Sequence, residues 1–199
     1  MNRMKIFYFL FFTFLGILKA EGQQSKFSIN QSVLNEVKIT VRAFEDSISH
    51  YDYSKNKVLF SEKYREFYGN KLQKLKELYQ KKYDNDKLIT QNKEVKTPAF
   101  SESDIENFSQ LKDLNEYLKR NFPTYFFNDS SSGKYSCQLI FKIDVDGEFK
   151  KITYKGENTE FNLISALYLY AVEKLEKPLI YQGKPVAFHF SQPFSMYLE

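Results

Sequence analysis

The first half of the chain carries apolar residues at helical spacing. Between residues 61 and 83 they recur three or four positions apart among Lys, Glu and Gln, at Tyr64, Phe67, Tyr68, Leu75, Leu78 and Tyr79. This period predicts an amphipathic helix with Ser61 as its N-cap and the tyrosines facing the core. Residues 33–49 fit two patterns, because their valines match both a short strand and a helical stripe. The choice between strand and helix stays open there.

The second half switches between helical and strand periods. Residues 109–122 repeat leucines at helical spacing and end at Phe122-Pro123, which predicts a helix. Residues 137–143 are apolar at every second position, which predicts a strand with one buried face. Asp146-Gly147 predicts a two-residue hairpin turn after it, because glycine accepts a positive φ without steric cost.

A return strand and a further helix follow the hairpin. The alternation in residues 149–155 slips once, which predicts a β-bulge that restores the buried face. Asn158 or Thr159 is the expected N-cap of a helix over residues 160–175. This helix is expected to bury one stripe, formed by Ile164, Leu167, Tyr168, Ala171 and Leu175.

The last predicted strand contains a proline. After a turn at residues 182–185, apolar residues keep one parity from Val186 to Leu198, with Pro193 inside the run. Proline cannot donate a ladder hydrogen bond, so this strand is predicted to be a sheet edge or to bulge at Pro193.

These elements predict an α+β protein with two regions. Residues 23–100 form a mainly helical N-terminal region, and residues 101–199 have the order α-β-β-α-β, with a small antiparallel sheet packed against two helices. The boundary is placed in the Lys- and Asn-rich connector of residues 84–98, which ends at Pro98.

Residues 1–22 are interpreted as a secretory signal peptide. Two cations precede an apolar run over residues 6–18, and the small residues Ala20 and Gly22 follow. The run is short for a bilayer core of about 30 Å, so an uncleaved anchor is the less favoured alternative. We therefore expect a periplasmic or secreted protein with no stable membrane span after cleavage.

The charge of the chain changes once this segment is set aside. The full chain has 29 Lys and Arg against 25 Asp and Glu, a net charge of +4. Removing residues 1–20 takes away Arg3, Lys5 and Lys19 but no acid, which leaves the chain nearly neutral. The electrostatic argument for a nucleic-acid partner disappears with them.

Few residues are suited to catalysis. The chain has two histidines, His50 and His189, in no metal-ligand spacing, and one cysteine, Cys137. Cys137 and His189 lie on predicted strands and could pair as nucleophile and base, but Cys137 shares the parity of the buried residues. The segment Asp144–Glu148 is similar to the start of a calcium loop, yet a hairpin turn explains it better. We expect no metal site, no cofactor and no enzymatic activity.

The element order and five short motifs point to a family. The motifs are Phe122-Pro123, Gly133, Phe141–Gly147, Gly183–Val186 and Pro193-Phe194. On these residues the chain from about 109 to 198 resembles the C-terminal domain of TonB-type energy transducers, in the form common in Bacteroidetes. Two features depart from that family: Glu176 stands where a Trp is usual, and the Pro-rich spacer is missing. The resemblance therefore implies the fold and the recognition mode, not energy transduction.

In the TonB family the last strand pairs with a short segment of a partner protein. An edge strand offers unpaired N–H and C=O groups that an extended segment can complete. By resemblance, the residues expected to bind the partner are Val186, Ala187, Phe188, His189, Phe190 and Ser191. The expected partner is a protein, such as an outer-membrane receptor or another envelope protein.

Three alternatives stay open. The N-terminal region could cover the last strand and leave a purely structural envelope protein. A pocket between the two regions could instead bind a small ligand or hold an enzyme site.

Overall fold

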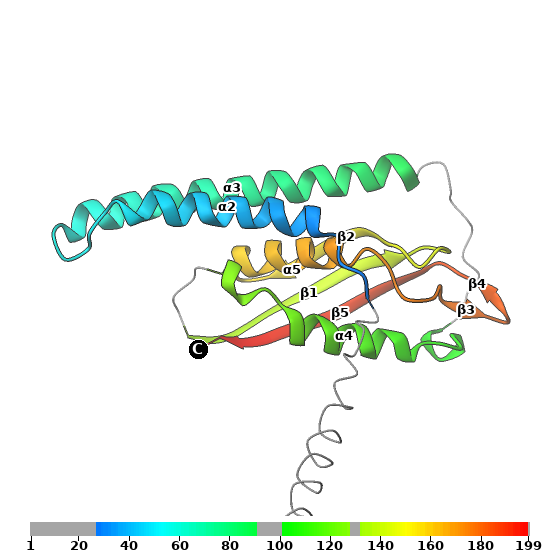
Figure 1. The fold of residues 1–199 in the computed structure, drawn as a ribbon. Coiled ribbons are helices and arrows are strands. Elements are labelled where there is room, and N and C mark those ends of the chain that lie inside the picture. The colour runs from blue at the N-terminus through cyan, green and yellow to red at the C-terminus, as the bar shows by residue number, and fades with distance from the viewer. Residues whose placement is uncertain (1–26, 91–100, 128–131, 199) are drawn as a thin grey trace, which may run out of the picture.

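The structure is a computed structural model that describes residues 27–90, 101–127 and 132–198. The predicted signal peptide, the end of the predicted connector and most of the polar loop at residues 128–133 lie outside the described residues. Figure 1 shows a helical hairpin stacked over a central helix, which in turn lies on a three-stranded sheet. The predicted α+β class, with a helical N-terminal region, is confirmed.

The N-terminal region is a hairpin of two helices. Helix α2 spans Gln31–Ser49, and its N-cap Asn30 accepts a hydrogen bond of 3.0 Å from the Ser32 N–H. The open choice for residues 33–49 is therefore settled as helix. Helix α3 spans Lys57–Thr90 and begins earlier than predicted. Ser61 is not its N-cap, because the Asn56 side chain accepts the Leu59 N–H at 3.0 Å, one turn before.

The C-terminal half follows the predicted element order. Its elements are η1 (Glu102–Asp104), α4 (Ser109–Asn121), η2 (Thr124–Phe126), β1 (Gly133–Ile143), β2 (Phe149–Gly156), α5 (Thr159–Val172), β3 (Ile180–Tyr181), β4 (Lys184–Pro185) and β5 (Phe188–Leu198). The main sheet is antiparallel with strand order β2-β1-β5, and β3 and β4 form a separate small hairpin.

The β1–β2 hairpin has the predicted bulge and a different turn. The register shifts between Ile140 and Lys142, so Lys151 and Ile152 together oppose Phe141, and Lys151 has φ 52°. The turn is centred one residue earlier than predicted: the Gly147 N–H donates to the Asp144 carbonyl at 3.0 Å. Gly147 is the last residue of this turn and has φ 81°, where glycine avoids the cost of a side chain.

Strand β5 keeps a regular register along its whole length. It pairs with β1 from Gly133↔Leu198 to Ile143↔Phe188 without a shift. Pro193 therefore sits in an edge strand and causes no bulge, which decides between the two predicted possibilities.

Helix α5 is buried on all sides. Every residue from Glu160 to Val172 is buried, whereas the sequence pattern predicted a single buried stripe. The reason is its central place, since the sheet covers one side and α2 and α3 cover the other (Figure 1). Asn158 is its N-cap and accepts the Phe161 N–H at 2.8 Å.

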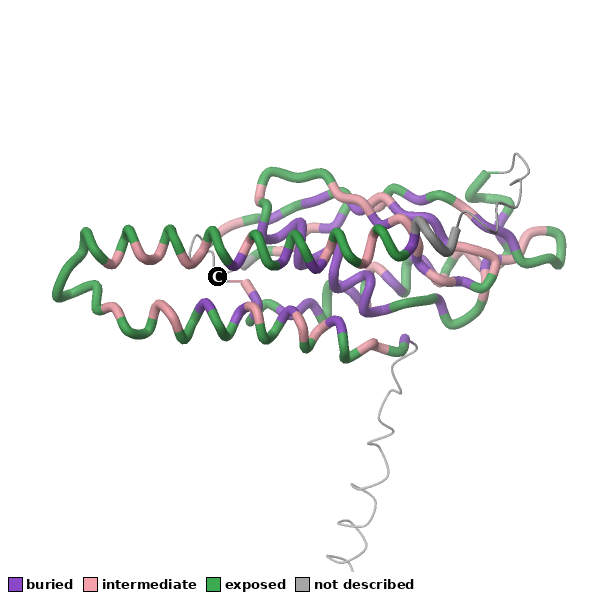
Figure 2. The backbone as a smooth tube through the Cα atoms, turned by 90° about the horizontal axis from the view of Figure 1, so that it is seen from above, coloured by how far each residue is buried: buried purple, intermediate pink, exposed green. Residues whose placement is uncertain are grey.

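One hydrophobic core serves both predicted regions. Buried residues of α2 and α3, such as Val37 and Leu75, belong to the same cluster as those of α5 and the sheet. Figure 2 shows that only the far tip of the α2–α3 hairpin, at residues 52–59, is exposed throughout. Across the three described ranges, no helix combines the length and the apolar character that a bilayer crossing requires.

Substitutions at two glycines, Gly156 in β2 and Gly69 in α3, test this packing. A Cβ at Gly156 would collide with Asn162 Oδ1 and lie 2.8 Å from the Ser136 carbonyl oxygen, whereas a Cβ at Gly69 in α3 meets nothing within 4 Å. We expect Gly156→Ala to lower the free energy of unfolding by about 1–3 kcal/mol. We expect Gly69→Ala to raise it by about 0.5–1 kcal/mol, because alanine favours helix. Urea unfolding measures both, and equal effects would contradict the packing at the β2–α5 junction.

Candidate functional site

The six residues predicted to bind a partner do not share one environment. Val186 and Ala187 precede β5 and are buried, and the Val186 N–H already donates to the Leu179 carbonyl at 2.9 Å. Phe188 and Phe190 face the core, whereas His189 and Ser191 are exposed on the other side of the sheet. The last strand, predicted from Val186 to Leu198, therefore begins only at Phe188.

The outer edge of β2 is closed by side chains of α3. The Tyr79 hydroxyl donates to the Ile152 carbonyl at 2.8 Å, and the Lys151 N–H donates to Asp86 Oδ2 at 3.2 Å. Burial raises the pKa of Asp86, although the nearby Lys150 ammonium opposes this shift. Helix α3 thus supplies hydrogen-bond partners to outward groups of the bulged strand, and at the start of β2 the Phe149 N–H donates to the Glu173 carbonyl at 2.8 Å.

The outer edge of β5 has no such cover among the described residues. β5 is the last strand of the sheet, and α2 and α3 lie over α5 and beside β2 (Figure 1). Helix α4 neighbours β5, and the residues that flank this helix contact the core face of the strand: the rings of Phe108 and Phe190 are 6.1 Å apart and those of Phe122 and Phe194 are 5.3 Å apart. The edge itself remains open in the described fold.

Pro193 indicates which backbone groups face outward. An edge strand tolerates proline where the nitrogen points away from its neighbour. Backbone groups alternate in direction along an antiparallel strand, so the N–H groups of His189, Ser191 and Ser195 share the outward direction with the Pro193 nitrogen. Their side chains lie on the exposed face and carry no carboxylate.

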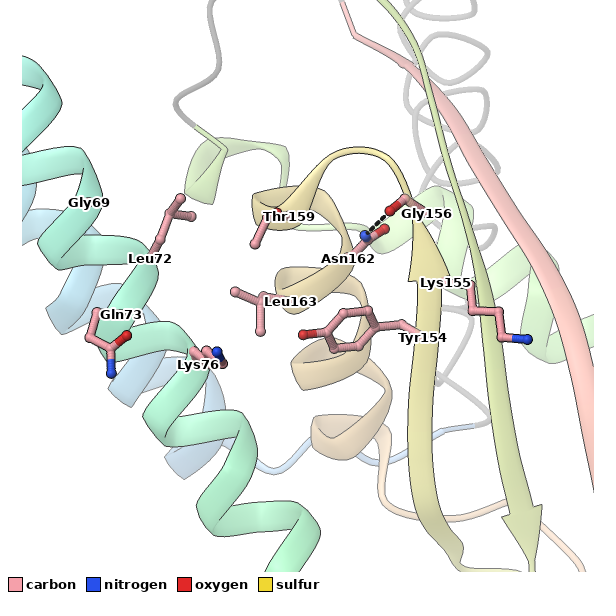
Figure 3. Close-up of a pocket in the computed structure, with 10 residues that line it drawn as sticks. All are labelled: Gly69, Leu72, Gln73, Lys76, Tyr154, Lys155, Gly156, Thr159, Asn162 and Leu163. Carbon is pink, nitrogen blue, oxygen red and sulfur yellow. Dashed lines mark hydrogen bonds between the residues drawn. The ribbon is translucent and has the colours of Figure 1, made fainter.

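A pocket does lie between the two predicted regions. It has a volume of about 390 Å³ and is lined by α3, the end of β2 and the start of α5 (Figure 3). The Tyr154 ring points into it, while Asn162 turns towards the strand and donates to the Gly156 carbonyl at 2.9 Å. Its lining contains no Cys, His, Asp or Glu, so it offers no nucleophile or general base of those types.

The structure does not bring Cys137 and His189 together. Cys137 pairs with Phe194 and faces the core, whereas His189 pairs with Lys142 and is exposed on the opposite face. Burial raises the pKa of the Cys137 thiol to about 11, which keeps it protonated at neutral pH. Within the described ranges, no group of three or more His, Cys, Asp and Glu side chains is placed to hold a metal ion.

A buried ion pair joins the two regions and was missed by the sequence analysis. Lys71 of α3 and Glu160 of α5 form an ion pair with both side chains fully buried, and the Tyr68 hydroxyl donates to Glu160 Oε2 at 2.9 Å. The Lys71 ammonium also lies 5.0 Å from the centre of the Phe44 ring. The sequence indicates this pair only by Lys71, a lysine that stands at the helical spacing of the apolar residues between Tyr68 and Leu75.

The geometry defines two edges of one sheet, of which α3 closes one and the described fold leaves the other open. In comparisons with known proteins, no family model, no curated protein and no solved structure matches this chain.

Proposed function

We propose that this protein is an exported binding protein that captures an extended segment of a protein partner by adding it as a strand to β5. The observation that carries the proposal is the difference between the two sheet edges. Side chains of α3 bond to two outward groups of β2, while β5 presents eleven residues in regular register and no described strand lies beyond it. An extended segment placed there gains main-chain hydrogen bonds.

The sequence supports the cellular setting of this proposal. The signal-peptide pattern of residues 1–22 favours export to the periplasm or beyond. The resemblance of residues 109–198 to TonB C-terminal domains favours an envelope protein, such as an outer-membrane receptor, as the partner. Without the Pro-rich spacer of that family, the proposed role is binding and not the transmission of force.

A proline at Ser191 tests the proposal. Ser191→Pro removes an outward N–H and adds bulk at the edge, while the ladder to β1 keeps its hydrogen bonds. Peptides selected from a display library on the unmodified protein are expected to bind the variant at least about tenfold more weakly, the effect of losing one or two hydrogen bonds. Titration by fluorescence anisotropy gives the dissociation constants.

Ser191→Ala is the matched control, because it removes the hydroxyl and keeps the N–H. It is expected to bind the selected peptides within about twofold of the unmodified protein. If Ser191→Pro folds normally and binds the same peptides equally well, strand addition to β5 is wrong. Loss of binding on Lys76→Ala instead would move the site to the pocket between α3 and α5.

A further inference from the structure

The three strands of the main sheet carry only positive charges. β1, β2 and β5 contain no aspartate or glutamate, while β1 and β2 hold the lysines Lys134, Lys142, Lys150, Lys151 and Lys155. Lys150 is paired with Glu148 at 2.7 Å and approaches Asp86 at 3.9 Å. The other four form no ion pair with the described residues. A sheet with this composition attracts negative charge.

The register places these cations on the open face of the sheet. The odd-numbered residues of β1 from Tyr135 to Ile143 are buried in the core, so the even-numbered Lys134 and Lys142 lie on the other face. Lys142 pairs with His189, and Gln138 pairs with Lys155. Figure 3 shows Lys155 pointing away from α5, opposite to its neighbour Tyr154.

Lys142 is the most buried of these lysines. Only 8% of its surface is exposed, although it lies on the open face, so its side chain is held by its neighbours instead of moving freely in solvent. The pKa of the adjacent His189 is lowered, first by burial and then by the positive charges of Lys142 and Lys151. The positive charges of Lys142 and Lys151 therefore already affect His189, a residue of β5.

The open edge lies within reach of this charge. Neighbouring strands are about 4.8 Å apart, so a segment added to β5 would run about 10 Å from β1. On β5, His189 stands opposite Lys142 and Tyr197 opposite Lys134, and the shorter Ser191, Pro193 and Ser195 lie along the strand between these two. A glutamate on the added segment and a lysine on β1 can span this distance together.

We propose that the segment captured by β5 is acidic, with Asp or Glu at the alternate positions that face the open side of the sheet. This inference rests on the proposed strand addition and names its partner class. The added strand supplies the main-chain hydrogen bonds, and its carboxylates reach over β5 beside His189 and Tyr197 towards Lys142 and Lys134. The charge fixes which face of the segment turns towards the open side.

Three peptides of about ten residues serve as probes. Each alternates valine with one polar residue, which is glutamate, glutamine or lysine. At low salt the glutamate peptide is expected to bind the full protein at least about tenfold more tightly than the glutamine peptide, and added NaCl reduces this difference. The lysine peptide is expected to bind most weakly. Equal affinities of the glutamate and glutamine peptides would overturn the inference.

Variants separate this inference from the proposed function. Lys142→Gln is expected to weaken the glutamate peptide about two- to fivefold and to leave the glutamine peptide unchanged. Lys112→Gln, at an exposed position of α4, is the control and changes neither. Ser191→Pro is expected to weaken both peptides. If only Ser191→Pro has an effect, strand addition stands and acid selection fails; if Ser191→Pro has none, the proposed function fails.

The two histidines give a readout that does not depend on affinity. Carboxylates placed over β5 are expected to raise the pKa of His189, measured from its ring C–H resonances in the peptide complex. His50 follows α2, remote from the sheet, and its ring C–H resonances serve as an internal control. An unchanged His189 titration curve at saturating peptide would contradict an acidic protein segment as the ligand. The same holds if a single-stranded oligonucleotide displaces the glutamate peptide and binds more tightly than it.

Discussion

Replacing Lys71 by methionine is expected to lower the free energy of unfolding by about 3–5 kcal/mol. Lys71 and Glu160 are both fully buried, so the variant leaves a carboxylate in the interior with the Tyr68 hydroxyl but without its cation. Removing one partner of a buried pair costs far more than the pair contributes as a whole, because the remaining charge stays desolvated. Urea unfolding monitored by circular dichroism measures the change.

Two further variants show whether the charge is the cause. Lys63→Met removes the exposed Lys63–Glu66 pair of the same helix and is expected to change stability by less than about 0.5 kcal/mol. The double variant Lys71→Met/Glu160→Leu is expected to regain most of the lost stability, because no unpaired charge remains in the core. A double variant as unstable as Lys71→Met would mean that shape and not charge explains the loss.

The fragment 101–199 is expected to show no cooperative unfolding transition. It corresponds to the C-terminal region that the sequence pattern delimits, but it would expose the side of α5 that α2 and α3 cover. Both helices of the hairpin contact this side of α5. The Asn30 N–H at the start of α2 donates to the Ala171 carbonyl at 2.7 Å, and the ring of Tyr79 in α3 lies 6.4 Å from the ring of Tyr170. A domain that loses one side of its core loses its stability margin of about 5–15 kcal/mol.

Thermal unfolding of the fragment beside residues 23–199 measures this effect. The longer chain contains α2 and α3 and is expected to melt cooperatively. Adding the α2–α3 hairpin as a separate peptide is expected to restore a transition in the fragment. A sharp transition in the fragment alone would show that the two regions have separate cores.

Local rules predicted most of the elements. Alternation identified β1, the slip near Ile152 identified the bulge, and Asn158 was one of two expected N-caps. The signals for these features lie within a few residues of one another. The N-cap of α3 was misplaced because Asn56 and Ser61 are both good caps, and the apolar stripe alone does not determine which one begins the helix.

The sequence pattern did not predict which elements pack against one another over long distances in the chain. The burial of the whole of α5 depends on α2 and α3 lying over it, which its own period does not encode. The closure of β2 depends on Tyr79 and Asp86, residues more than sixty positions before the strand that they contact. By contrast, Pro193 limited β5 to an edge position or a bulge, because a missing N–H restricts where a strand can lie, and the structure has the edge.

Amide hydrogen exchange of β5 is the most direct test of partner capture at this edge. The protein is compared free and saturated with a display-selected peptide. Strand addition predicts slower exchange at the outward N–H groups of His189, Ser191 and Ser195, with no new protection along β2, whose edge α3 already covers. Unchanged exchange at these three amides, with protection confined to the pocket between α3 and α5, would contradict it.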